Sequence, residues 1–241
     1  MISNERWQFA QHAEEVYQRQ KANANTHNMN GIISIAEQKS EYVVKLLSML
    51  EFATREDHSA IEIGSGSHGM IWKLPCKDRT AIDPLADFYF EKFQQLQDNG
   101  TKIIAAKGED IPLPDECADI VLSENVLDHT HQPVQVLHEV ARLLRPGGRF
   151  YCSVDVHGPV WFLLNGVYNL LFNIGLKLNV RAFPAHPHHF RKKDVQGLFE
   201  KVALRVLWHR SGNPVRTSGS VWGKIKFWFG KNGLIELVAT K

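Results

Sequence analysis

Short apolar runs alternate with segments of helical composition between residues 59 and 154, and this alternation restricts the fold more than any other feature of the chain. The five strand-like runs are SAIEIG, TAIDP, TKIIAA, ADIVLS and GRFYCSV, and helical patterns fall at residues 88–96 and 134–144. Such alternation predicts a parallel sheet with helices on both faces. Two further strand-like runs, ALRVLWHR and LIELVATK, lie near the C-terminus. We therefore expect an α/β fold with a Rossmann-like, doubly wound, mostly parallel sheet of seven strands.

The 241 residues are expected to form a single domain over 1–241. Residues 1–34 would form an N-terminal helical cap, helical over 5–22 and then an asparagine-rich loop before a second helical run at 32–53. Residues 35–156 would form the ligand-binding core, and residues 157–190 an insertion after the fifth strand, on the substrate side. A C-terminal helix and strands would occupy residues 191–241.

Charge and cysteine content exclude several classes of protein. A net charge of +2 gives no electrostatic reason to expect nucleic acid as a partner. Cys76, Cys117 and Cys152 form no CxxC pair, so neither a disulfide framework nor a zinc knuckle is indicated. The polar N-terminus lacks the apolar core of a signal peptide, which favours a cytoplasmic location.

Two apolar stretches stand apart from the sheet pattern, at residues 160–178 and 221–231. In the first, Asn165, Asn169 and Asn173 recur every four residues and so share one face of a helix. This spacing predicts an amphipathic helix. Two roles stay open for these stretches, a lid over a substrate and a contact with a membrane surface.

The stretch AIEIGSGSHG places a glycine-rich turn directly after the first strand, where open α/β sheets bind ligands. It lacks the GxxxxGK[ST] pattern of a triphosphate loop, and no GxGxxG opens a helix. Asp83 ends the second strand, 21 residues after Glu62, where an acid can accept both hydroxyls of a ribose. An ordinary strand-end acid before Pro84 is the alternative. Glu62 lies within a strand, where a carboxylate needs partners.

The motifs EIGSGSHG, AIDP and residues 108–154, which include IPLP and LRPGG, resemble the class I S-adenosylmethionine-dependent methyltransferases over roughly residues 35–154. The resemblance implies that the cofactor is S-adenosyl-L-methionine, released as S-adenosyl-L-homocysteine. His68, Lys107 and Gln132 depart from the family pattern, which affects individual contacts. The positions that the resemblance assigns to the cofactor are Glu62, Gly64, Ser65, Gly66, Asp83, Gly108, Glu109, Asp110 and Ser123.

Methyl transfer from a sulfonium requires positioning and, for some acceptors, removal of a proton. No metal ion is required, and we assign none, although Asp128 and His129 were weighed as ligands. Histidine suits the role of base because its pKa of about 6.5 lies near neutrality. The candidates beyond the strand ends are His157, after the fifth strand, and His186 and His189 of the HPHHF segment; hydrogen bonding within that loop is the alternative.

The hypothesis drawn from the sequence is a methyltransferase that acts on a small molecule at oxygen. The acceptor would be apolar or amphiphilic, because the apolar residues at 160–178 lie where such enzymes carry their specificity. That segment and the N-terminal helix, with Trp7 and Tyr17, would close over the acceptor. The alternatives are a methyltransferase-like binding protein without catalysis and a nicotinamide-dependent oxidoreductase.

Overall fold

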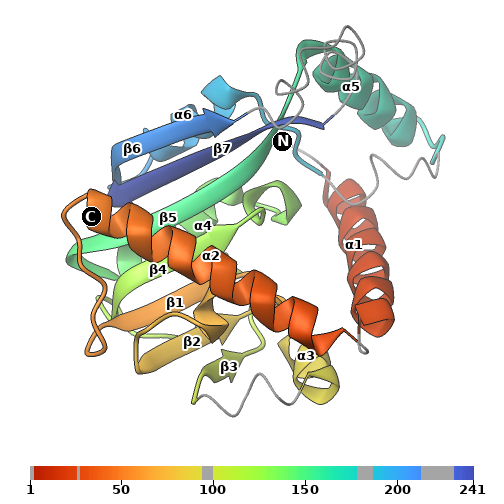
Figure 1. Ribbon diagram of the computed structural model, residues 1–241. Helices are drawn as coiled ribbons and strands as arrows, with labels where there is room; N and C mark the ends of the chain where they lie inside the picture. Colours follow the sequence, from red (N-terminus) through yellow and green to blue (C-terminus); the bar gives the residue numbers. More distant parts are fainter. Residues whose placement is uncertain (1–2, 26–27, 94–99, 178–186, 213–230) are drawn as a thin grey trace, which may run out of the picture.

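The computed structural model describes residues 3–25, 28–93, 100–177, 187–212 and 231–241. Its seven strands form one sheet in the order β3-β2-β1-β4-β5-β7-β6. The first five strands run parallel, and β7 runs antiparallel to both β5 and β6, which confirms the expected mostly parallel sheet (Figure 1). The strands are β1 (Ser59–Ile63), β2 (Asp78–Ile82), β3 (Lys102–Ile104), β4 (Ala118–Glu124), β5 (Leu144–His157), β6 (Arg205–Gly212) and β7 (Lys231–Thr240).

Helices cover both faces of the sheet, as the alternation predicted. Helix α2 (Met29–Met49), the short helix η1 (Met70–Trp72) and α3 (Ala86–Lys92) pack on one face. Helices α4 (Pro133–Leu143) and α6 (Lys192–Phe199) pack on the other (Figure 1). Because side chains alternate along a strand, Ile61 and Ile63 of β1 face α4, whereas Ala60 packs with α2.

The first helix is longer than the sequence pattern predicts, and the second begins and ends earlier than the expected residues 32–53. Helix α1 spans Asn4–Asn25, and α2 begins at Met29, where Asn28 caps it by accepting a hydrogen bond from the Gly31 amide at 3.3 Å. The expected asparagine-rich loop is therefore largely helical. The expected boundary at residue 34 falls inside α2, because Ile32 and Ala36 of this helix are buried in one core.

Helix α1 lies across the edge of the sheet at which the parallel strands end, between α5 (Pro159–Asn173) and α3 (Figure 1). Only three of its residues are buried, so polar side chains make much of its contact with the rest of the protein. Three of these contacts are Arg6 Nε to Asn169 Oδ1 at 3.2 Å, Gln11 Nε2 to the His129 carbonyl at 2.7 Å, and Tyr89 Oη to Gln18 Oε1 at 3.4 Å.

In helix α5, Tyr168 and Phe172 are buried, whereas Phe162 and Leu164 are 39% and 43% exposed and Asn173 is also exposed. No helix within the described ranges is long and apolar enough to cross a membrane. The second apolar stretch, residues 221–231, lies outside the described residues except for Lys231.

Candidate active site

The glycine-rich loop begins where β1 ends, between β2 on one side and β4 on the other. This is the point at which the strand order reverses, and it is the preferred ligand site of an open α/β sheet. Gly64 and Gly66 both adopt positive φ, at +73° and +51°. A Cβ atom on Gly64 would lie 2.3 Å from Cγ2 of Val126, whereas one on Gly66 would meet no atom within 4 Å. Gly64 is therefore fixed by packing, and Gly66 borders open space.

Replacement of the two glycines by alanine should separate these roles. Gly64→Ala is expected to lower the free energy of unfolding by about 3 kcal/mol, because the new methyl group overlaps Val126. Gly66→Ala should cost only about 1–2 kcal/mol, from its left-handed backbone. Urea unfolding of both variants measures the difference. Equal losses would contradict the distinction drawn between the two positions.

Glu62 lies beneath the loop and holds the turn that follows it. Its carboxylate Oε2 accepts a hydrogen bond from the Ile71 amide at 2.7 Å, and the residue is 1% exposed. Burial raises the pKa of Glu62 to about 8, against the opposing effect of the backbone donors. A Cβ on Gly69 would come within 2.5 Å of Oε2, so this glycine admits the carboxylate. Glu62 supports the loop from its inner side.

Asp83 joins the end of β2 to the same loop. Its Oδ2 accepts a hydrogen bond from the Gly66 amide at 3.0 Å, and its Oδ1 accepts one from the Leu85 amide at 2.8 Å. Burial raises the pKa of Asp83, while the two backbone donors act in the opposite direction. Each carboxylate oxygen has a second lone pair. Asp83 can thus accept further hydrogen bonds from a ligand beside Gly66.

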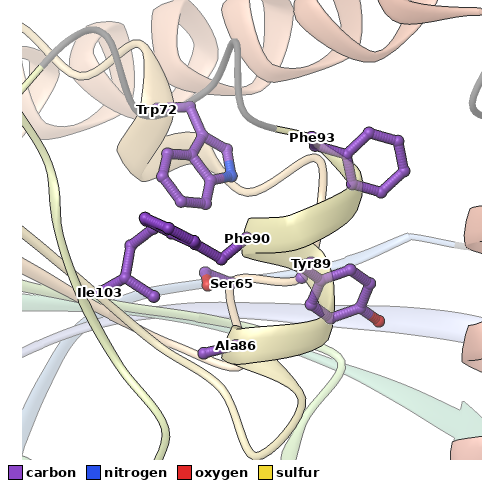
Figure 2. Close-up of a pocket in the computed structure, with 8 residues that line it drawn as sticks. Ser65, Trp72, Ala86, Tyr89, Phe90, Phe93 and Ile103 are labelled. Carbon is purple, nitrogen blue, oxygen red and sulfur yellow. The ribbon is translucent and has the colours of Figure 1, made fainter.

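Two hollows lie near these residues. The larger has a volume of about 440 Å³ and is lined by Pro84, Ala105, Ala106, Lys107, Asp110 and Pro112. Its position next to Asp83 in the chain and its largely apolar walls suit a flat heterocyclic base. The other, where Trp72, Tyr89, Phe90 and Phe93 surround Ser65 (Figure 2), has a volume of only about 10 Å³. A space of that size holds at most one water molecule.

Three of the residues assigned to the cofactor support the site from behind. Oε1 of Glu109 accepts hydrogen bonds from the His131 and Gln132 amides, at 2.7 and 3.3 Å, and so holds the turn that precedes α4. Gly108 is a packing position, since a Cβ there would lie 3.0 Å from Ile63 Cγ2. Ser123 is fully buried, and its Oγ has no hydrogen-bond partner among the described residues. Of the acids in this turn, Asp110 lines the larger hollow.

Two lysines near the glycine loop were not found by sequence reasoning. Lys39 of α2 forms an ion pair with Glu124, at the end of β4. Burial, together with the smaller effect of the charges on Lys21 and Lys39, lowers the pKa of His68 to about 4. His68 is therefore neutral, with Nδ1 2.6 Å from Ser67 Oγ. No motif marks these lysines, because only the packing of α1 and α2 brings them to the loop.

The structure brings together His157 and His189, two of the three predicted histidines. Their ring centroids are 4.8 Å apart, and the ring of Trp161 lies 6.0 and 6.3 Å from them. His157 ends β5, and its amide donates to the Phe190 carbonyl at 2.8 Å, which places His189 beside it. Both histidines are about 5% exposed. The third, His186, lies outside the described residues.

His188 points away from this pair, as expected for an extended segment. Its Nε2 is 3.3 Å from the His131 carbonyl, and its ring stacks on Phe190. Burial lowers the pKa of His188. Its amide also donates to the Asp128 carbonyl, so the segment is held against the loop that follows β4. Within the described ranges, no group of three or more His, Cys, Asp or Glu side chains could hold a metal ion.

The strand order with antiparallel β7 between β5 and β6, the glycine loop after β1 and the acid after β2 together define a class I S-adenosylmethionine-dependent methyltransferase domain. Residues 61–152 match the family model described as a methyltransferase domain. S-adenosylmethionine is the cofactor of the family.

Known proteins agree with this assignment over part of the chain. An uncharacterised methyltransferase of Mycobacterium avium is 34% identical over 113 residues, which is 46% of this chain and 44% of the relative. Human thiol S-methyltransferase is 32% identical over 134 residues, covering 46% and 54%. This chain thus spans about half the length of these curated relatives.

A solved structure shares the fold at low sequence identity. It is the geranyl diphosphate C-methyltransferase of Streptomyces coelicolor, in complex with Mg²⁺, geranyl diphosphate and S-adenosyl-L-homocysteine. It superposes with a TM-score of 0.55 at 13% identity, over 83% of this chain and 77% of its own. At this level of identity, the likeness concerns the fold alone.

Proposed function

We propose that this protein transfers a methyl group from S-adenosylmethionine to a small-molecule acceptor. The observation that carries the proposal is the open side of Gly66, whose amide donates to Asp83, together with the 440 Å³ hollow lined by the next residue, Pro84. The cofactor supplies an electrophilic methyl group on a positively charged sulfur. The residues present fit it, because they offer acceptors for hydroxyls, an apolar slot for a base and positive charge for a carboxylate.

Each part of the cofactor has a matching set of residues in this proposal. The ribose hydroxyls donate to Asp83, whose two oxygens lie beside the loop. The adenine occupies the hollow between Pro84 and Ala106, where the exposed Asp110 can accept from its amino group. Lys21 and Lys39, whose charges act on His68 beside the loop, attract the carboxylate of the methionine end.

Asp83→Ala should weaken binding of S-adenosylhomocysteine by about 1.5–3 kcal/mol, the usual contribution of hydrogen bonds to a charged acceptor. Asp83→Asn keeps one amide oxygen as an acceptor and should lose less affinity. Titration calorimetry measures both, and thermal unfolding shows whether the loop contact to Gly66 also contributes to stability. Unchanged affinity in both variants would place the cofactor elsewhere.

The acceptor is proposed to react at oxygen, with a histidine as the base. The pair formed by His157 and His189 lies past the carboxyl end of β5, two strands away from β1. Two strand spacings separate His157 from the glycine loop by about 10 Å across the sheet, and His157 lies four residues, or about 13 Å, further along β5 than the level of Gly64. One imidazole takes the hydroxyl proton as the oxygen forms its bond to the methyl carbon, and the carbon–sulfur bond breaks with its electron pair left on sulfur.

A thiol is the second candidate acceptor, favoured by the similarity to human thiol S-methyltransferase. A thiol ionises near pH 8.5, so its transfer depends less on a base than that of an aliphatic hydroxyl. Replacement of the histidines distinguishes the two candidate acceptors, because the rate of methyl transfer should fall more for a hydroxyl than for a thiol.

Helices α1 and α5 are proposed to cover the acceptor and exclude water. Trp7 of α1 supports this role, since its ring lies 4.7 Å from Lys107 Nζ and 4.9 Å from the ring of His131. Tyr17, which was expected to take part, is 55% exposed. The mostly polar contacts of α1 are compatible with opening, because little buried apolar surface is lost.

The proposal is tested by calorimetry with S-adenosylhomocysteine and NAD, followed by incubation with labelled S-adenosylmethionine and a panel of alcohols, phenols and thiols. We expect binding of the first ligand only and transfer of label to a member of the panel. Binding without transfer to any acceptor supports a non-catalytic binding protein, and preferential binding of NAD supports an oxidoreductase. Either result would overturn the proposal.

A further inference from the structure

Helix α5 buries Asn165, Tyr168 and Phe172 against the protein and turns a second, apolar face outward. Asn165 is 8% exposed, and Asn169 accepts a hydrogen bond from the buried Arg6. On the opposite side, residues at intervals of four, three and four form one continuous stripe. The stripe consists of Leu163, Val167, Leu170 and Ile174, which are 67%, 47%, 62% and 65% exposed.

An ordinary surface helix turns polar residues to solvent, whereas the outward face of α5 is apolar. Adjoining residues extend the apolar surface, since Phe162, Leu164 and Leu176 are 39%, 43% and 53% exposed. Scattered apolar side chains are common on protein surfaces, but a contiguous set on one helix marks an interaction surface. The polar contact between Arg6 and Asn169 fixes the helix with its apolar stripe facing outward.

The charge of the chain is divided unevenly, and α5 belongs to its basic part. Residues 156–235 contain 12 lysines and arginines and two acids, a net charge of +10. Residues 1–155 contain 15 basic and 23 acidic residues, a net charge of −8. The small net charge of the whole chain conceals this division. A basic region that carries an apolar helix face complements a surface that is both apolar and anionic.

Basic side chains flank the helix at both ends. The Arg191 guanidinium lies 4.4 Å from the ring of Phe162, near the start of α5. Arg191 forms an ion pair with Asp194, and Lys177, after the end of α5, forms one with Glu5. Lys192 and Lys193 follow Arg191 and are exposed. No acid occurs between Asp155 and Asp194 in the sequence. The apolar residues of α5 suit the acyl boundary of an anionic membrane, and the cations beside the helix suit its phosphate layer.

We propose that the outward face of α5 docks the protein on an anionic membrane surface. The stripe enters the boundary between headgroups and acyl chains, and the exposed Lys192 and Lys193 contact lipid phosphates. This binding does not depend on the proposed reaction, because α5 uses its other face toward the protein.

Co-sedimentation with vesicles tests the proposal. We expect the parent protein to bind vesicles in which about a third of the lipid is phosphatidylglycerol, and to bind phosphatidylcholine alone at least tenfold more weakly. Raised salt should weaken the binding to anionic vesicles. The variant L163S/L170S should lose about tenfold or more in partition, because two apolar side chains leave the interface. Lys192→Ser with Lys193→Ser should lose several-fold.

Met49→Ser is the matched control, because Met49 is 72% exposed at the end of α2 and lies in the acidic part of the chain. It should bind vesicles like the parent protein. Circular dichroism verifies that each variant is folded. The proposal is overturned if the parent binds neither kind of vesicle, or if L163S/L170S binds as the parent does. It is also overturned if the parent sediments as a dimer that L163S/L170S dissociates, since the stripe is then an interface between two copies.

Discussion

Replacement of His189 by glutamine is expected to lower kcat for a hydroxyl acceptor by about 10²–10⁴-fold, with the affinity for S-adenosylhomocysteine unchanged. Glutamine retains hydrogen-bonding capacity but cannot take a proton near neutral pH. His157→Gln should cause a similar loss if the two rings, 4.8 Å apart, act together, and a smaller one if His157 only orients His189. Measurement of kcat against pH with labelled cofactor distinguishes these cases. The variant that removes the base should also lose the ionisation near neutrality.

His188→Gln is the control for this experiment, because it changes a neighbouring histidine that faces away from the pair. Its kcat should stay within a few-fold of the parent value. If all three variants keep the parent's rate and pH profile, transfer depends on positioning alone and no histidine acts as a base. A thiol acceptor should show a much smaller loss in His189→Gln than a hydroxyl acceptor does, because a thiol ionises more readily.

Glu62→Gln is expected to remove a large pH dependence of stability. In the parent, burial raises the pKa of Glu62 from 4.5 to about 8 in the folded state. The folded state then binds this proton more tightly than the unfolded chain does. Its contribution to stability is fully present below pH 4.5 and is lost as the pH rises through about 8. This rise in pKa corresponds to a loss of up to about 5 kcal/mol in the free energy of unfolding between pH 4.5 and pH 8.

Glutamine mimics the protonated carboxyl and can still accept the Ile71 amide, so the variant should show a flatter profile and exceed the parent's stability at alkaline pH. Urea unfolding from pH 5 to 8.5, without cofactor, measures this. Glu139→Gln provides a comparison of opposite sign, because hydrogen bonds from Arg142 lower the pKa of Glu139. That variant should be less stable than the parent near pH 7, and the difference should shrink in acid. A parent profile that does not fall with rising pH would contradict the Glu62 prediction.

The order and type of the sheet elements could be predicted from the sequence because their signal is local. Each strand in the core is a short apolar run bounded by turn residues. Because the side chains on both faces of these strands are buried, helices must cover both sides of the sheet. The glycine loop and Asp83 were found for the same reason, since chain order alone places them at neighbouring strand ends. The N-terminal helices were less accurately predicted, because the capping contact of Asn28 and the burial of Ile32 outweigh the weak helix propensity of asparagine.

The sheet order, the glycine-rich loop and the candidate histidines could be predicted from the sequence alone, because each is marked by a local pattern. Tertiary packing shows which acid faces the hollow: Glu109 accepts from two backbone amides of the turn before α4, whereas Asp110 remains at the surface. It also paired His157 with His189, although 31 residues of chain separate them. The sequence also could not predict that the apolar stripe of α5 faces outward. Helical spacing shows which residues share a face, but not whether that face packs on the protein. Contacts between residues distant in the chain, such as that of Arg6 with Asn169, set these orientations.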